Sequence, residues 1–156
     1  MKIRKLPIFL FLIFILSAPL FGQTAAKVEA LLNKTELTWL EVTAFVLEAS
    51  EAGIFRNEQE AFNLAAGNKW LPKKAESIGT AQLQGVALLL MRSFNLQGGI
   101  FYSMTKSPHH AYRELVFKKV IRGTTDPLMS VSGRDLLLMT GRLLAMRENA
   151  AEGALQ

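Results

Sequence analysis

Residues 111–145 have the sequence AYRELVFKKVIRGTTDPLMSVSGRDLLLMTGRLLA, and this stretch decides the fold because it predicts a helix, a tight loop and a second helix. The first helix is expected to end near Ile121. The loop at residues 122–127 combines glycine, aspartate and proline, which favour turns. Ser132 is placed to cap the second helix, and Asp135, three residues later, completes a variant of the capping box.

Helical periodicity also occurs in the rest of the chain. Apolar residues recur at helical spacing in four further segments, which are residues 24–33, 35–52, 57–66 and 81–96. No run of alternating strands accompanies them. The sequence therefore predicts an all-α fold, in which two helix–loop–helix units pack as a small bundle after an N-terminal signal peptide. The two units are expected at about residues 35–98 and 100–146.

Three positions give more detailed expectations about helix ends and packing. Gly53 followed by Ile54 predicts a Schellman-type end for the preceding helix, with Ile54 making the hydrophobic contact. Thr80 is expected to cap the helix that follows it. Gly85 lies inside that helix, where glycine costs up to about 1 kcal/mol relative to alanine. We therefore expect another helix to pack closely against Gly85.

The first residues have the anatomy of a secretory signal peptide. Met1–Lys5 is basic, and residues 6–16 are apolar apart from Pro7. Cleavage is expected after Gly22, or as late as Ala26. The alternative is an uncleaved anchor, although a membrane-spanning helix needs about 20 apolar residues. In that alternative the protein would contact the membrane through this segment only.

The processed protein is expected to be a single α-helical domain at residues 27–147, followed by a flexible tail at residues 148–156. The chain has no cysteine, which excludes disulfides and a lipid-modified cysteine. Lys2, Arg4 and Lys5 would leave with the signal peptide, so 15 of the 18 basic residues remain against 13 acidic ones. This balance, without a basic block, argues against nucleic acid as a partner.

The stretch at residues 111–144 resembles the S-layer homology repeat, in which a helix, a loop with glycine and aspartate, and a second helix opened by a Thr-Arg-Ala-Glu-like tetrad follow one another. The matching positions are Ala111, Leu115, VIRG at 120–123, Asp126, VSGRD at 131–135 and RLL at 142–144. In the earlier unit, GI at 53–54 matches the turn and LMRSFNL at 90–96 matches the helix end. The match covers two repeats and most of the processed chain.

The resemblance implies a helical module that binds envelope glycan through the tetrad arginine. Gly133 stands in the place of that arginine, and Arg134 comes one residue later. In the earlier unit the counterpart is GTAQ at residues 79–82, which has neither arginine nor glutamate. The family usually builds its grooves from three repeats, and two are recognisable here. A scaffold that kept the fold and lost glycan binding is therefore the alternative.

Two short motifs suggest catalytic or metal chemistry. Ser103 and Lys106 fit Ser-x-x-Lys, in which the amine takes the proton of the hydroxyl on a helix. The partner motifs Ser-Asp-Asn and Lys-Thr-Gly do not occur, and the segment before Pro108 is expected to be a loop. His109 and His110 are adjacent, whereas a metal site needs three or four convergent ligands. We expect no enzyme, no metal and no other cofactor, and a hydrolase is the weakest hypothesis.

The candidate ligand-binding residues are Arg122, Thr124, Arg134 and Trp70. The first three belong to a loop beside a helix N-terminus, which favours anions. Trp70 is included because aromatic side chains stack on sugar rings. Further aromatic and basic candidates for contact with a sugar are Trp39, Tyr112, Phe101, Arg92, Arg113 and Arg142. The alternative is that Trp39 and Tyr112 belong to the core and that the arginines lie on solvated helix faces.

These features predict a non-catalytic binding or adaptor module of the cell envelope, exported to the periplasm or the cell surface. Its expected partner is a cell-wall polysaccharide or an envelope protein.

Overall fold

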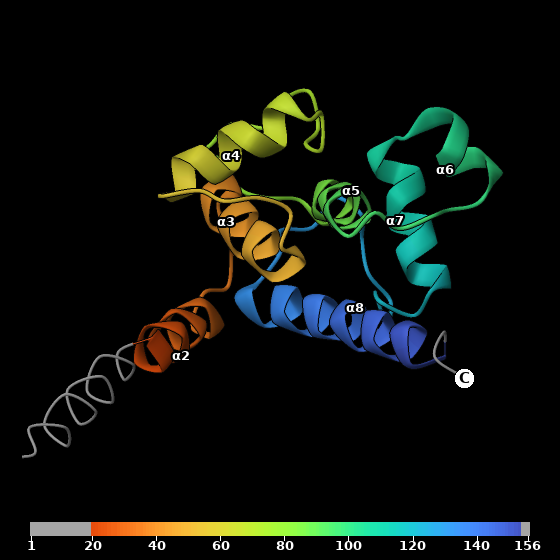
Figure 1. Cartoon of the computed structure of the whole chain (residues 1–156). Coiled ribbons are helices and arrows are strands. Elements are labelled where there is room, and N and C mark those ends of the chain that lie inside the picture. Colours follow the sequence, from red (N-terminus) through yellow and green to blue (C-terminus); the bar gives the residue numbers. More distant parts are fainter. Residues whose placement is uncertain (1–19, 154–156) are drawn as a thin grey trace, which may run out of the picture. The chain divides into compact units, whose positions relative to one another are not determined.

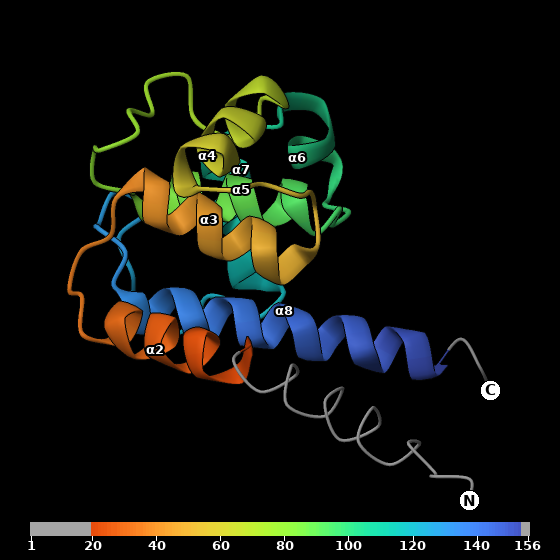
Figure 2. The same cartoon turned by 60° about the vertical axis from the view of Figure 1, so that its left-hand side comes forward.

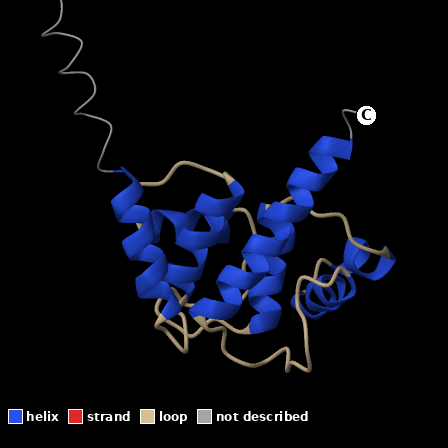
Figure 3. Ribbon diagram, turned by 90° about the horizontal axis from the view of Figure 1, so that it is seen from below, coloured by secondary structure: helices blue, strands red, loops and turns tan. Residues whose placement is uncertain are grey.

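The computed structural model describes residues 20–153, and this part of the chain is all-helical, which confirms the predicted fold class (Figures 1 and 3). Within it, two isolated β-bridges are the extended pairings that the backbone makes. The helices are α2 (Leu20–Leu32), α3 (Trp39–Ser50), α4 (Glu58–Gly67), α5 (Leu83–Ser93), α6 (Ile100–Thr105), α7 (Pro108–Phe117) and α8 (Gly133–Gly153).

The chain divides into two compact units, one up to Asn33 and one from Lys34 onward. The described part of the first unit consists of α2 and the residue that follows it. The expected cleavage points after Gly22 and Ala26 fall inside α2, and most of the predicted signal peptide lies outside the described residues. Of the helices in residues 20–153, none is long and apolar enough to cross a membrane.

The second unit is a bundle whose central helices are α3, α5 and α8. Helix α3 packs against α4, α5 and α8, while α7 packs against α5 and α6 packs against α7 (Figures 1 and 2). Helices α4 and α7 therefore each lie on the central helix that precedes them in the sequence, and α6 lies on α7. The core follows the length of α5, where every residue from Gly85 to Met91 is buried.

A ring of three backbone hydrogen bonds joins the starts of the central helices. The N–H of Leu37 donates to the carbonyl of Val131 at 3.0 Å, Val131 donates to Ala81 at 3.1 Å, and Ala81 donates to Leu37 at 2.8 Å. All three residues are buried, and each precedes the first residue of its helix by two positions. The bundle therefore has three equivalent helix starts, one more than the two units recognised in the sequence.

Side chains cap two of these three starts. The Thr38 Oγ1 atom accepts from the N–H of Glu41 at 3.4 Å, and the Glu41 carboxylate accepts from the N–H of Thr38 at 2.9 Å, which is a full capping box. The predicted cap at α8 is confirmed, because the Ser132 Oγ accepts from the N–H of Asp135 at 3.1 Å. At α5 the N-cap is Gln82, which makes no side-chain cap, so the prediction that Thr80 caps this helix is wrong.

The predicted C-cap at Gly53 is also wrong. Helix α3 ends at Ser50, and the left-handed residue is Glu51, with φ of 55°. Ile54 is fully exposed and makes no Schellman contact. The helix therefore ends three residues before the glycine that was expected to follow its end.

Residues 100–110 are more helical than predicted. The segment before Pro108, which was expected to be a loop, contains α6, and α7 begins at Pro108 itself. Ser107 is the N-cap, with its Oγ accepting from the N–H of His110 at 3.3 Å, and Pro108 occupies the first turn. Proline is favoured there because the first helical N–H groups have no partner inside the helix. Helix α7 accordingly begins before Ala111 and ends at Phe117, four residues before the expected end at Ile121.

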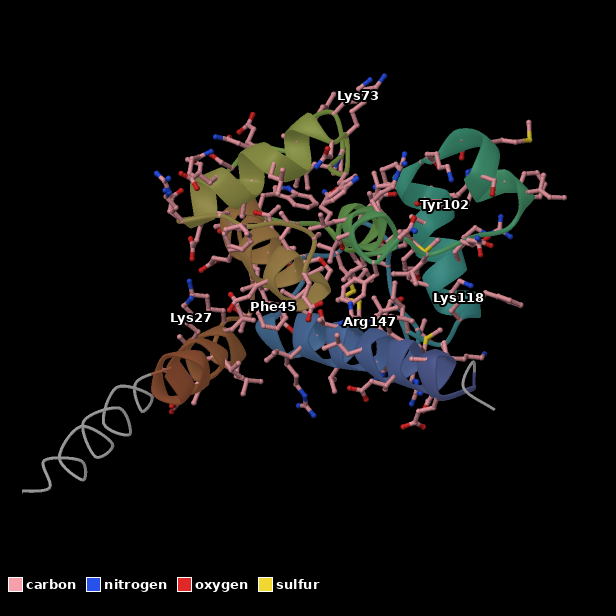
Figure 4. All side chains as sticks on the ribbon, in the orientation of Figure 1. Lys27, Phe45, Lys73, Tyr102, Lys118 and Arg147 are labelled. Carbon is pink, nitrogen blue, oxygen red and sulfur yellow. The ribbon has the colours of Figure 1, made fainter. Side chains whose placement is uncertain are left out.

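The C-terminal residues differ from the flexible tail that was expected from residue 148. Helix α8 continues to Gly153, and residues 148–153 are exposed. Their alanine and glutamate residues are good helix formers, so the helix extends without packing. Arg147 lies four turns into α8 (Figure 4), and its guanidinium forms an ion pair of 3.8 Å with the Glu51 carboxylate.

Candidate functional site

A cleft of about 140 Å³ lies between the start of α5, the first half of α8 and the loop from α7 to α8. Its apolar wall comes from six side chains, which are Leu83, Ile121, Met129, Val131, Leu138 and Met139. Its polar groups are Arg122, Thr125, Ser130, Asp135 and Arg142. The cleft adjoins the backbone ring, because Val131 belongs to both.

Two guanidinium groups reach the cleft from different elements. Arg142 projects from α8 and donates from its Nη1 to the carbonyl of Val120 at 2.6 Å. Arg122 belongs to the turn after α7 and donates from its Nε to the carbonyl of Lys119 at 3.0 Å. The Arg122 bond leaves its terminal Nη groups available to a ligand. Both arginines are therefore positioned by backbone carbonyls of the same segment, residues 119–122.

The hydroxyl groups of the cleft are also held in place. The Tyr112 hydroxyl donates to the carbonyl of Thr125 at 2.9 Å and lies 2.7 Å from the Thr125 Oγ1. The Ser130 hydroxyl donates to the Glu36 carboxylate at 2.9 Å, which ties the loop to the segment before α3. These bonds fix a loop that has little regular structure of its own.

The start of α8 is already occupied by its own side chains. The Ser132 hydroxyl donates to the Asp135 Oδ2 at 2.6 Å while it accepts the Asp135 N–H. A ligand carboxylate placed at this helix end would meet the Asp135 carboxylate, and like charges repel. An anionic group would therefore be held by Arg122 and Arg142 instead of by the helix N-terminus.

The size and charge of the cleft limit its ligand. Pockets for drug-sized ligands span about 300–1,000 Å³, so a cleft of about 140 Å³ holds one group of a larger molecule. Two arginines against one aspartate give a net positive charge. Guanidinium groups bind carboxylates in a bidentate manner, and the remaining hydroxyl and carboxylate groups suit a polyol. The arrangement fits one polar, hydroxylated unit.

The four sequence-predicted residues do not come together. Arg122 lines the cleft, whereas Thr124 and Arg134 are exposed and are not part of its wall. Trp70 is half-buried in the loop after α4, where its backbone N–H donates to the carbonyl of Ala65 at 2.9 Å. The predicted group therefore spreads over two separate parts of the bundle.

The sequence predicted a capping role for Asp135 and left Arg142 outside the four preferred ligand-binding residues. The two residues are seven positions apart on α8, so they lie on one helix face. Leu138 and Met139 lie between them and complete that part of the wall. The spacing was a usable signal, but nothing local marked this face as the lining of a cleft.

The Ser-x-x-Lys pair is not assembled for catalysis. The Ser103 Oγ donates to the carbonyl of Gly98 at 3.3 Å. The Lys106 Nζ lies 4.7 Å from the centre of the Tyr102 ring, in a cation–π contact. Each side chain is engaged elsewhere, so the lysine does not contact the serine.

The histidines lie in the first turn of α7 instead of a loop. His110 has hydroxyl partners, with its Nδ1 lying 2.7 Å from the Thr105 Oγ1 and 3.0 Å from the Ser107 Oγ. Among the described residues, no group of three or more His, Cys, Asp or Glu side chains could hold a metal ion.

The other aromatic candidates occupy three different environments. Trp39 is buried against Gly85, which confirms the close helix packing expected there. Tyr112 is half-buried and bonded to Thr125, while Phe101 is exposed. None of them lines the cleft.

Comparison with known proteins found no matching family model, no similar curated protein and no similar solved structure.

Proposed function

We propose that this chain is a non-catalytic binding or adaptor module of the cell envelope, and that its cleft takes one sugar unit of a cell-wall polysaccharide. The observation that carries the proposal is that Arg122 and Arg142 line the same small cleft as six apolar side chains, together with Asp135 and Thr125. An acidic or acetylated sugar suits this set. Its carboxylate or carbonyl would bind the guanidinium groups, its hydroxyls would bond Asp135 or Thr125, and its apolar part would cover the wall.

The arrangement of the helix starts supports the proposal. The S-layer homology repeat, which residues 111–144 resemble, usually builds its glycan grooves from three repeats. The bundle has three helix starts on one backbone ring, and the cleft lies beside the third. At the first start, Thr38 and Glu41 stand in the places of the tetrad threonine and glutamate. This match at Thr38 and Glu41, which adds to the two units predicted above, was not recognised from the sequence.

The proposal also places the protein outside the cytoplasm, in the periplasm or at the cell surface. It rests there on the signal-like residues 1–22, with their basic start and apolar run. The expected partners remain a wall polysaccharide or an envelope protein.

A protein–protein scaffold is the second candidate, and one observation favours it. Gly133, in the place of the tetrad arginine, is buried and offers no side chain. Arg134, one residue later, is exposed outside the cleft. If the family's contact depends on that arginine, the fold would be retained without the sugar site. The Ser-x-x-Lys hydrolase has no comparable support, because Ser103 and Lys106 are engaged elsewhere.

The test is binding of the purified chain to peptidoglycan sacculi, with and without their secondary polymers, and with lysozyme as the positive control. Arg122→Ala should weaken saturable binding by about tenfold, which corresponds to about 1.4 kcal/mol for a lost charge-assisted hydrogen bond. Arg134→Ala is the matched control, because Arg134 is also exposed and loses the same charge but does not line the cleft. It should leave binding unchanged.

Two results would contradict the cleft assignment. Equal weakening by Arg122→Ala and Arg134→Ala would indicate general attraction to anionic wall polymers. No binding by a chain with an intact helical circular dichroism spectrum would reject the glycan ligand and favour the scaffold.

A further inference from the structure

Helices α6 and α7 form an arm that exposes four large apolar side chains. Ile100, Phe101 and Met104 of α6 are 76%, 70% and 79% exposed, and Phe117 at the end of α7 is 81% exposed. Single exposed apolar residues are common on soluble proteins, but groups of them mark interaction sites. The grouping on this arm therefore needs an explanation.

Three of these residues form one patch on α6, and Phe117 lies apart from them at the end of α7. On α6, residues 100, 101 and 104 share one side of the helix, while Tyr102 points the other way and is buried. The Phe101 ring stacks on the His110 ring of α7, with the ring centres 5.9 Å apart. His110 and Phe117 are seven residues apart on α7 and lie on the same helix face. The apolar patch of α6 thus meets α7 at His110, and Phe117 lies two turns further along α7, with Arg113 and Glu114 between them on that face.

Helix α6 is held with this face outward. The N–H of Gly99 donates to the Glu114 Oε1 of α7 at 2.9 Å. The buried Tyr102 ring lies so close to Gly98 that a β-carbon there would be 2.6 Å from its Cδ1 atom. Figure 4 shows Tyr102 between α6 and α7, with Lys118 projecting from the end of α7. The exposure of the patch is therefore built into the packing of the arm.

The arm is also the basic part of the molecule. Residues 98–123 contain five basic side chains, Lys106, Arg113, Lys118, Lys119 and Arg122, and one acidic side chain, Glu114. Within residues 20–153, the remaining positions carry ten basic and twelve acidic side chains. Arg113, Lys118 and Lys119 are within four residues of Phe117, whereas the Lys106 ammonium lies over the Tyr102 ring. Basic groups therefore border the apolar patch.

We propose that this arm docks on the surface of an anionic lipid bilayer. Apolar side chains would enter the boundary between headgroups and acyl chains, and the lysines and arginines would bind anionic headgroups. A second copy of the chain is disfavoured as the occupant, because a two-fold contact would bring the same basic groups together. This membrane contact is additional to the N-terminal segment, and Arg122 is the one residue that it shares with the glycan cleft.

The test uses the full chain with a single reporter in the patch. Because the chain has no cysteine, Met104→Cys creates a unique site for an environment-sensitive fluorophore. Ile78→Cys is the matched control, since Ile78 has the same 79% exposure as Met104 but lies in the loop before α5. Vesicles of phosphatidylglycerol should shift the emission of the label at position 104 to the blue, and vesicles of phosphatidylcholine should do so much less. The label at position 78 should not respond.

The comparison separates the arm from the N-terminal segment. If only the N-terminal segment holds the chain on the vesicle, neither label enters the bilayer and the proposal is rejected. Equal shifts at positions 78 and 104 would also reject it, because they would indicate adsorption without orientation. Replacing Lys118 and Lys119 with glutamine should weaken the response on the order of tenfold, given about 1 kcal/mol for each basic residue near an anionic surface. An unchanged response in that variant would contradict the electrostatic part of the proposal.

Discussion

Glu41 connects three groups at the start of α3. Its carboxylate accepts from the N–H of Thr38 at 2.9 Å and from the Thr38 hydroxyl at 3.0 Å, and it pairs with the Lys34 ammonium. Burial raises the pKa of Glu41, but the bonds from Lys34 and Thr38 outweigh it, so the pKa lies below the ordinary 4.5. The hydrogen bond to Glu41 correspondingly raises the pKa of Lys34.

These shifts predict how the stability of the chain depends on pH. Because the pKa of Glu41 is lower in the folded state than in the unfolded state, its contribution is present above about pH 4.5 and is lost as the pH falls through the folded pKa. Glu41→Gln should therefore lower the free energy of unfolding by about 1 kcal/mol at pH 7, typical of a lost cap. The difference from the original chain should shrink at pH 3.

Urea unfolding at the two pH values measures this effect. Glu48→Gln is the control, because Glu48 is exposed on the same helix and is not part of the cap. It should change the free energy of unfolding little at either pH. A Glu41→Gln penalty of equal size at pH 7 and pH 3 would show that the charge of this carboxylate does not stabilise the helix start.

At the scale of helices, the crossing of α3 and α5 depends on Gly85. A β-carbon at Gly85 would lie 2.7 Å from the Trp39 Cη2 and 2.7 Å from the Pro72 Cγ. Both neighbours are rings, which cannot move aside at low cost. The absence of a side chain therefore allows the two central helices to approach, as the interior glycine predicted.

Gly85→Ala should consequently destabilise the bundle by about 1–3 kcal/mol, which is typical of overpacking. Gly141→Ala is the matched control, because Gly141 lies inside α8, is exposed, and would place its β-carbon in open space. That change should stabilise by about 0.5–1 kcal/mol, since alanine is the better helix former. Thermal unfolding followed by circular dichroism measures both. Stabilisation by Gly85→Ala would mean that α3 and α5 do not approach this closely.

At the scale of the whole bundle, the backbone ring of Leu37, Ala81 and Val131 ties together three distant parts of the chain. Its amides lie just outside helices, where exchange with solvent is ordinarily fast. Because they are buried and bonded to one another, they should open only when the bundle unfolds.

Hydrogen exchange followed by NMR should find these three amides among the slowest of residues 34–153. The Arg56 amide, whose bond to Glu60 is exposed, is the fast-exchanging comparison. Equally fast exchange of the ring amides would mean that the helix starts open independently.

The sequence by itself determined the helical class, the approximate helix positions and the cap at Ser132. These features depend on interactions between residues three or four positions apart, which the sequence displays directly. The sequence placed the Gly53 C-cap and the Thr80 N-cap wrongly. Neighbouring residues compete for such positions, and packing selects between them.

The tertiary structure alone decided the ring, the third helix start and the cleft. Leu37, Ala81 and Val131 are separated by 44 and 50 positions, and no local pattern marks them as partners. The same holds for the cleft, where Arg142 meets the carbonyl of Val120 across 22 positions and Arg122 arrives from a turn. Thr124 and Arg134 are close to Arg122 in sequence but outside the cleft, because the direction of a side chain depends on the helix or turn that carries it. Packing between distant segments therefore selects which arginines line the cleft.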